Sequence, residues 1–247
     1  MTAEKCCEIW GPTRSSPFVL CCDHASNAVP VSVNGGDLGL PADDMDRHIA
    51  YDVGAAGLTR ALADLLDAPA ILSCWSRLVI DPNRAERDPT LVRRIYDGTV
   101  VPANRHVDQI EIDRRLISYY RPYHDALAAF LAERETIVLV SVHSFTPCLR
   151  GRLQRPWQVG ILHSQRDQRF SKALIRRLRA VSTAPVGDNE PYSGHLPGDT
   201  VDRHALDHGR HNTLIEVRND LIGEVKGQRD MAMFLAPMLQ QTLEEFI

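Results

Sequence analysis

Two histidines each follow a run of apolar residues that is typical of a buried strand. His24 comes shortly after the run 18–22, and His143 directly follows the run 137–142. In open α/β sheets, residues beyond the carboxyl ends of the strands line the ligand crevice. If the two strands are parallel neighbours, both imidazoles can bind one metal ion. The alternative for either histidine alone is an ordinary side chain whose hydrogen bonds are satisfied within the fold.

A third metal ligand must come from nearby, because catalytic zinc sites keep three protein ligands and leave one position open for water. The sequence offers Asn27, three residues after His24, and the carboxylates of Asp44 and Asp46. An amide is a poor zinc ligand, which favours an aspartate. We therefore predict one Zn²⁺ per chain, bound by His24, His143 and Asp46. Asp44 and Asn27 stay as alternatives for the third ligand.

Glu216 is a charged residue inside the apolar run 213–217. It either faces solvent from an edge strand or acts as an acid or base at the rim of the sheet. Arg218, Asn219 and Asp220 follow it and make the strand end polar. Zinc lowers the pKa of a bound water toward about 7, and a nearby carboxylate can take the proton of that water. Glu216 is therefore the predicted catalytic residue.

A turn after another apolar run carries groups that could bind a substrate carboxylate. Pro82 forces the turn, and Asn83 and Arg84 then offer a neutral donor and a planar guanidinium. A guanidinium binds a carboxylate through two parallel hydrogen bonds. Arg77, just upstream, could be a second cation in the same pocket, and Arg218 is a further candidate. Taken alone, the segment could also be a surface turn with a solvated arginine.

The order of the predicted elements indicates an α/β fold. Strand-like runs occur at residues 18–22, 70–74, 77–80, 137–142, 158–162 and 213–217. Segments with helical periodicity lie at residues 46–67, 110–130, 171–179 and 228–244, with Pro122 as an expected kink or break. This alternation predicts a mixed, mainly parallel sheet flanked by helices. We find no linker or internal repeat and expect a single domain over residues 1–247, with a binding loop at 185–198.

The composition leaves small-molecule or protein partners as the default. A hydrophobic content of 44%, a charged content of 24% and a net charge of −4 give no bias toward nucleic acid or an anionic membrane. Neither a membrane-spanning segment nor a secretory signal is evident, so we expect a cytoplasmic protein. We expect a carboxylate-bearing substrate, and a homo-oligomer stays open.

Other common catalytic motifs are missing from the sequence. The six cysteines form no CxxC motif, which disfavours a zinc-thiolate site or a disulfide framework. The sequence also lacks GxSxG, GxGxxG, GxxxxGK[ST] and HExxH. A serine hydrolase, a phosphate cradle and a helical zinc motif are therefore not supported. If zinc is bound, its ligands are scattered over strand ends.

Several short segments, taken together, resemble the N-formylglutamate amidohydrolase family, whose fold is similar to that of the zinc carboxypeptidases. The segments are residues 23–27 (DHASN), 46–55 (DRHIAYDVGA), 77–84 (RLVIDPNR), 142–145 (VHSF), 189–192 (NEPY) and 215–220 (IEVRND). Each is short, but their number and order run through most of the chain. The resemblance implies a zinc-carboxypeptidase-like hydrolase that cleaves a C–N amide bond in a small acylated amino acid such as N-formyl-L-glutamate.

The resemblance also implies roles for individual residues. His24 and His143 correspond to the metal-binding histidines, and Glu216 to the general base. Asn83 with Arg84 resembles the pair that holds the substrate carboxylate. The carboxypeptidase pattern has a glutamate three residues after its first histidine, where this chain has Asn27. The expected function is a zinc-dependent amidohydrolase; the alternatives are a related deacylase, a carboxypeptidase-like peptidase, or a catalytically inactive binding protein of the same fold.

Overall fold

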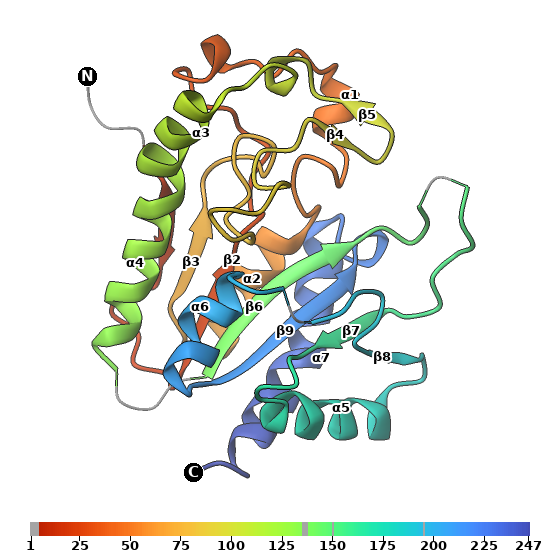
Figure 1. Cartoon of the computed structure of the whole chain (residues 1–247). Coiled ribbons are helices and arrows are strands. Elements are labelled where there is room, and N and C mark those ends of the chain that lie inside the picture. The colour runs from red at the N-terminus through yellow and green to blue at the C-terminus, as the bar shows by residue number, and fades with distance from the viewer. Residues whose placement is uncertain (1–4, 135–137, 150, 195) are drawn as a thin grey trace.

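A seven-stranded mixed sheet forms the centre of the protein (Figure 1). The computed structural model describes residues 5–134, 138–149, 151–194 and 196–247. The sheet order is β1 (Cys7–Trp10), β3 (Ala70–Ser73), β2 (Phe18–Cys22), β6 (Val138–Phe145), β9 (His211–Arg218), β7 (Val159–Leu162) and β8 (Val186–Asp188). Strand β1 pairs antiparallel with β3, and β7 pairs antiparallel with β9; the other four pairings are parallel. The predicted mixed, mainly parallel α/β sheet is confirmed.

Helices cover both faces of this sheet. One hydrophobic cluster joins it to α2 (Ala55–Leu65), α5 (Arg169–Val181) and α7 (Val225–Leu243). A second cluster joins the opposite face to α4 (Arg121–Ala132) and α6 (Thr200–His204). Along β2, Phe18 and Leu20 belong to the first cluster, whereas Val19 and Cys21 belong to the second. Successive side chains point to opposite faces of a strand, so burial on both faces explains the continuous apolar runs.

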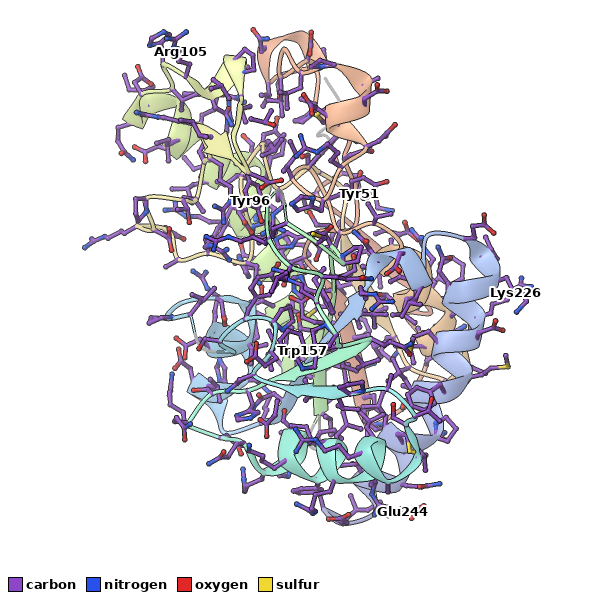
Figure 2. The ribbon with its side chains drawn as sticks, turned by 90° about the vertical axis from the view of Figure 1, so that its right-hand side faces the viewer. Tyr51, Tyr96, Arg105, Trp157, Lys226 and Glu244 are labelled. Atoms are coloured by element: carbon purple, nitrogen blue, oxygen red, sulfur yellow. The ribbon has the colours of Figure 1, made fainter. Side chains whose placement is uncertain are left out.

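A third cluster packs near the carboxyl ends of β2 and β3, in the upper part of Figure 1. It is built from loops together with α1 (Ala42–Met45), β4 (Ile95–Tyr96), α3 (Gln109–Arg115) and the π-helical turn 116–120. Strand β5 (Thr99–Val100) pairs with β4, and single 3₁₀ turns lie at residues 34–36, 102–104, 206–208 and 219–221. Figure 2 shows Tyr96 near the middle of the molecule, between this upper layer and the strands.

Most predicted elements are found, with shifted ends. Strand β6 extends to residue 145, although residue 137 of the predicted run lies outside the described residues. The helical prediction for 110–130 corresponds to α3, the π turn and α4, which follow one another over residues 109–132. Pro122 does not break this segment; it lies in the first turn of α4, directly after the π turn 116–120. The helices predicted at 171–179 and 228–244 are α5 and α7.

Two predictions from apolar periodicity are wrong. Residues 77–80 form turns rather than a strand; the run is apolar because Leu78, Val79 and Ile80 are buried in the third cluster. The helix predicted at 46–67 begins only at Ala55, because residues 46–54 form turns and bends, of which Ile49, Ala50 and Asp52 are buried. Gly54 precedes that helix with φ +79°, and a Cβ there would come within 2.1 Å of the Ile222 carbonyl oxygen. Strands β1 and β8 were not predicted.

Within the described ranges, every helix is too short or too polar to cross a bilayer.

Candidate active site

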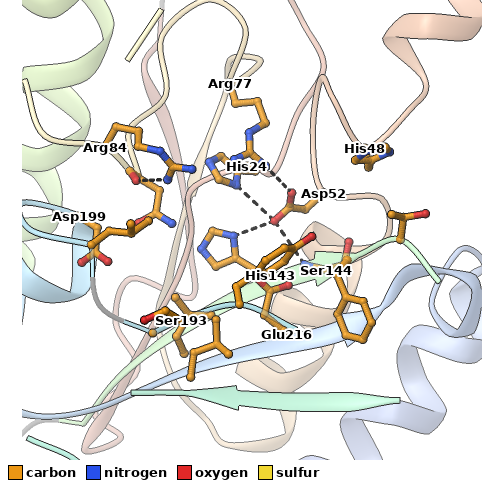
Figure 3. A pocket seen from close by; sticks show the side chains of 18 of the residues that line it. His24, His48, Asp52, Arg77, Arg84, His143, Ser144, Ser193, Asp199 and Glu216 are labelled. Atoms are coloured by element: carbon orange, nitrogen blue, oxygen red, sulfur yellow. Dashed lines mark hydrogen bonds and ion pairs between the residues drawn. The ribbon is translucent and has the colours of Figure 1, made fainter. Parts of the chain in front are cut away.

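Three neighbouring strands bring the predicted catalytic residues to one rim of the sheet. His24 follows the end of β2, His143 lies near the end of β6, and Glu216 lies on β9. Strands β2 and β6 are parallel neighbours, as the metal prediction requires, and Glu216 is directly opposite His143 in the β6–β9 ladder. These side chains line a cavity of about 340 Å³ (Figure 3). This volume suits a small-molecule ligand.

His24, His143 and Asp52 form a buried cluster whose ligand atoms converge. The Nδ1 atoms of the two histidines lie 3.3 Å and 2.7 Å, respectively, from the same oxygen, Oδ2 of Asp52. All three candidate ligand atoms lie within 4.8 Å of one another. Each of the three side chains is at most 4% exposed. The cluster offers two imidazole nitrogens and one carboxylate oxygen to a single point, so these residues could bind a metal ion.

Two further aspartates face the outer nitrogens of these histidines. Nε2 of His24 lies 2.7 Å from Oδ1 of Asp81, and Nε2 of His143 lies 3.3 Å from Oδ2 of Asp23, outside hydrogen-bond geometry. Both aspartates are fully buried. Histidines that bind metals commonly donate their other N–H to a carboxylate, which fixes the tautomer and the ring orientation. The Nδ1 atoms of both histidines therefore face Oδ2 of Asp52, whereas their Nε2 atoms face the two outer aspartates.

Arg77 pairs with Asp52, the carboxylate of the buried cluster, and with Asp81 behind His24. It donates to Oδ1 of Asp52 at 3.1 Å and to Oδ2 of Asp81 at 3.2 Å. Burial opposes the ionisation of both aspartates most strongly, but their neighbours together hold the pKa of each well below its usual value: His24 and His143 for Asp52, and His24 and Arg77 for Asp81. Burial would lower the pKa of His143, yet its aspartate contacts raise it. With both histidines neutral, as metal binding requires, the three carboxylates outnumber the two guanidinium groups that pair with them, Arg77 and Arg93, which favours binding of a cation.

Asp52 is the functional candidate that the sequence prediction missed. It lies in the turns before α2, and its backbone N–H donates to the carbonyl oxygen of His24 at 2.9 Å. The backbone N–H of Ser144 lies 3.3 Å from its Oδ2 atom. These bonds tie the turn to the ends of β2 and β6. A signal was available, since Asp52 is a charged residue within the segment 46–55 that resembles the family.

The carboxylate predicted as the third ligand lies elsewhere. Asp46 is exposed, lies outside the cluster, and accepts a hydrogen bond from the Asn27 side chain at 3.1 Å. Asp44 pairs with Arg47 at 2.7 Å. Asp44 and Asp46 line a separate, shallower depression. The structure thus brings His24 and His143 together with Asp52 and not with Asp46, Asp44 or Asn27.

Glu216 is a buried carboxylate on the cavity wall, 7% exposed. Its Oε2 atom has no hydrogen-bond partner among the described residues. Burial raises the pKa of Glu216 to about 7, while His143 opposes and Asp52 adds to this rise. A carboxyl group with a pKa near neutrality can both accept and release a proton at physiological pH.

Asn83 and Arg84 line the same cavity, and Arg84 forms no ion pair with any described residue. Its guanidinium donates to the backbone oxygen of Asn83 and to the Thr90 hydroxyl. Arg77 also lines the cavity but is occupied by Asp52 and Asp81. Of these cations, Arg84 is the one whose charge is available to a ligand.

Arg218, the remaining predicted substrate contact, is not among the residues that line the cavity. It pairs with Asp220 at 2.8 Å. The structure therefore places Asn83, Arg84 and Arg77 at the cavity but directs Arg218 to another carboxylate.

The loop 189–194 closes the cavity on the side of β7. Glycine is required where this loop crosses the strand, because a Cβ on Gly160 would come within 2.0 Å of the Glu190 oxygen. The loop brings Tyr192 to the wall, where the Arg155 guanidinium lies 4.9 Å from its ring. Arg155 also packs against Phe145, at 5.5 Å. The predicted loop at 185–198 thus helps to form the cavity, although its first part is strand β8.

Comparison with known proteins agrees with this arrangement. A family model described as N-formylglutamate amidohydrolase matches residues 16–223. The structure of gene product Atu2144 from Agrobacterium tumefaciens is similar, with a TM-score of 0.92 and 32% identity over 98% of this chain and 96% of that one. No curated protein matches the sequence.

More distant structures share the fold. N-formylglutamate amidohydrolase from Ralstonia eutropha JMP134 has a TM-score of 0.65 and 19% identity, over 97% of this chain and 99% of that one. A bacteriophage poly-gamma-glutamate hydrolase has a TM-score of 0.51 and 10% identity, over 100% of this chain and 92% of that one. The family match covers most of the chain, including the cavity residues at all three strand ends. The chain therefore belongs to the N-formylglutamate amidohydrolase family and is a hydrolase of C–N bonds other than peptide bonds.

Proposed function

We propose that the protein is a zinc-dependent amidohydrolase that cleaves the amide bond of a small N-acyl amino acid. The observation that carries this proposal is the convergence of both Nδ1 atoms on one oxygen of Asp52. The same cavity holds a carboxylate of raised pKa, Glu216, and an unpaired cation, Arg84. These are the parts that metal-assisted hydrolysis of a carboxylate-bearing amide needs.

The donor set of His24, His143 and Asp52 fits zinc. Two imidazole nitrogens and one carboxylate oxygen are a known ligand set of catalytic zinc, and three protein ligands leave an open position. Asp81, 2.7 Å from Nε2 of His24, fits the role of a carboxylate that orients a metal-binding histidine, and Asp23 lies behind His143. When bound, zinc supplies Lewis-acid polarisation of the amide carbonyl and lowers the pKa of water. We therefore replace Asp46 by Asp52 as the proposed third ligand.

Glu216 is the proposed general base and acid. It takes a proton from the attacking water and returns it to the leaving nitrogen. Its position opposite His143, a proposed metal ligand, supports this role. Its Oε2 atom also has no hydrogen-bond partner among the described residues that would compete with a water molecule. A pKa of about 7 suits both transfers, since the ionised and protonated forms are then close in free energy.

Asn83 and Arg84 are the proposed binding pair for the substrate carboxylate. The side-chain oxygen of Asn83 lies 3.3 Å from the backbone N–H of Thr200 and is oriented to accept its hydrogen bond. That bond orients the amide so that its NH₂ group can donate to a ligand. Arg84 adds a planar guanidinium that is not paired with a carboxylate among the described residues. In this proposal Arg77 holds Asp52 and Asp81 in place rather than binding the substrate, and Arg218 has no direct role.

Zinc-loaded protein should be assayed against a panel of N-formyl and N-acetyl amino acids and small dipeptides, with metal content measured in parallel. Stoichiometric zinc and turnover of the N-acyl amino acids are the expected results. Turnover of dipeptides alone would indicate a peptidase instead. Bound zinc without any turnover would indicate a binding protein that kept the fold.

A further inference from the structure

Asp199 is a buried carboxylate in the wall of the cavity that the proposed reaction does not use (Figure 3). It is 4% exposed. It precedes α6 as its N-cap, and its Oδ1 atom accepts a hydrogen bond from the backbone N–H of Asp202 at 2.7 Å. An ionised carboxylate has about four lone-pair sites, so one cap bond leaves capacity for a ligand.

This carboxylate lacks a cation of its own. No arginine or lysine within the described ranges forms an ion pair with Asp199. Burial raises its pKa to about 6, against the cap bond, and the charges of Asp23 and Asp202 act in the same direction as burial. A buried carboxylate without a counterion costs free energy, and a cationic group of a ligand would offset that cost.

Three leucines, Leu162, Leu196 and Leu214, line the cavity together with Asp199. Leu162 and Leu214 are directly opposite each other in the β7–β9 ladder and are 4% and 7% exposed. Such a surface can pack against the aliphatic stem of a long side chain while a polar end reaches the carboxylate.

Asp199 is also tied to the proposed carboxylate-binding pair. The backbone N–H of the next residue, Thr200, donates a hydrogen bond to the side-chain oxygen of Asn83. The Thr200 hydroxyl donates to Asp23. A substrate whose α-carboxylate is held by Asn83 and Arg84 would therefore lie close to Asp199, within reach of its side chain. A glutamate side chain would bring a second negative charge to this place, which is unfavourable.

We propose that Asp199 and the three leucines select N-acyl amino acids whose side chain has an aliphatic stem and a cationic end, of the lysine type. This inference rests on the proposed function, because it takes Asn83 and Arg84 as the holder of the α-carboxylate. Asp199 then pairs with the substrate ammonium group, and the leucines cover the stem. The protein would differ in substrate class from the glutamate derivative for which its family is named.

The test compares N-formyl-L-lysine, N-formyl-L-norleucine and N-formyl-L-glutamate as substrates of the zinc-loaded protein. Norleucine has a stem like that of lysine without the charge. We expect kcat/KM to fall in the order lysine, norleucine, glutamate. Asp199→Asn should lower the lysine-to-norleucine ratio roughly tenfold or more, because close charge pairs couple strongly in desolvated sites. Asparagine is also a good N-cap, so the variant should keep the fold.

Asp207→Asn is the matched control. Asp207 is 55% exposed and pairs with Arg166, so this variant removes the same charge outside the cavity. It should leave the ratio unchanged. A wild-type preference for glutamate over lysine, or an unchanged ratio in Asp199→Asn, would overturn the inference.

Calorimetric binding of L-lysine and L-glutamate separates this inference from the proposed function. Binding of the amino acid products needs no turnover. If no N-acyl compound is hydrolysed, lysine-selective binding that Asp199→Asn abolishes still supports the inference. Hydrolysis with equal binding of lysine and glutamate supports the proposed function and overturns the inference alone.

Discussion

Around the two histidines carboxylates outnumber guanidinium groups, whereas on helix α3 two guanidinium groups pair with one carboxylate, Glu111. We call the first group the cavity cluster; it consists of Asp23, Asp52, Asp81 and Arg77. Its single guanidinium donates to two of the three carboxylates, and all four side chains are buried. Arg93 adds a more distant contact, 3.9 Å from Asp81, so one negative charge is left for the histidines or a bound metal cation to balance.

The α3 cluster consists of Glu111, Arg114 and Arg115. Arg114 donates two hydrogen bonds to Glu111, at 2.6 and 2.8 Å, and Arg115 donates one at 2.8 Å. Arg115 also donates to the carbonyl oxygen of Val79 and to the side-chain oxygen of Asn104. Every carboxylate oxygen here has a donor. A charge cluster in which every carboxylate oxygen has a donor supports the fold, whereas a cluster with surplus carboxylates marks a binding site for a ligand.

The largest expected effect is that of Asp52→Asn. Removing the carboxylate shared by both Nδ1 atoms should release zinc and lower kcat/KM by about a thousandfold, since metal catalysis contributes several kcal/mol. Zinc content by mass spectrometry and turnover measure this. Asp46→Asn is the matched control, because Asp46 is exposed and outside the cluster, and it should keep both zinc and activity. Loss of zinc in Asp46→Asn but not in Asp52→Asn would restore the original ligand prediction.

Glu216→Gln should lower kcat by about a hundredfold, the low end of what a general base contributes, while zinc stays bound, because it removes the proton acceptor but keeps the size of the side chain. Comparing kcat with zinc content separates this role from a structural one. An unchanged zinc content would show that Glu216, unlike Asp52, is not a metal ligand. Turnover equal to that of the wild type would show that the proton goes elsewhere.

Arg84→Gln should lower kcat/KM for an N-formyl amino acid by about tenfold to a hundredfold, the range expected for a lost charge-assisted hydrogen bond of about 1.5–3 kcal/mol. A substrate with a carboxamide in place of the carboxylate should show little change. Arg218→Gln is the control and should match the wild type, because Arg218 pairs with Asp220. If Arg218→Gln had the larger effect, the assignment of the available cation would be incorrect.

Local sequence was enough to predict the strand ends that carry the site. His24, His143 and Glu216 each stand out as polar residues in or just after an apolar run. Parallel pairing of β2, β6 and β9 then brings them together without further information. Asn83 and Arg84 were found for a similar reason, since they directly follow a buried segment.

The third member of the histidine cluster could not be predicted in this way. Asp52 reaches it through turns whose apolar residues, such as Ile49 and Ala50, imitate helical periodicity because they are buried. The contact with His143 spans 91 residues and depends on how that loop closes over β2 and β6. The buried partners Asp23 and Asp81 were equally hidden, because their role depends on which histidine nitrogen they face.

The smallest expected effect is in the α3 cluster. Hydrogen bonds from Arg114, against a smaller effect of burial, lower the pKa of Glu111 to about 2. Glu111→Gln should reduce the free energy of unfolding by about 1 kcal/mol at neutral pH, a modest value because solvent screens this surface group. Activity and zinc content should not change. Urea unfolding of both proteins measures the difference.

The pH dependence of that difference tests its cause. A carboxylate whose pKa is lowered on folding stabilises the protein above its unfolded pKa, here near 4.5, and loses this contribution as the pH falls toward 2. The gap between wild type and Glu111→Gln should therefore be full at pH 6 and shrink steadily between pH 4.5 and pH 2. Asp230→Asn, which removes the partner of the exposed Lys226, should show no measurable gap at any pH. A constant gap for Glu111→Gln would mean that packing, rather than charge, stabilises α3, and the contrast with the cavity cluster would then not rest on electrostatics.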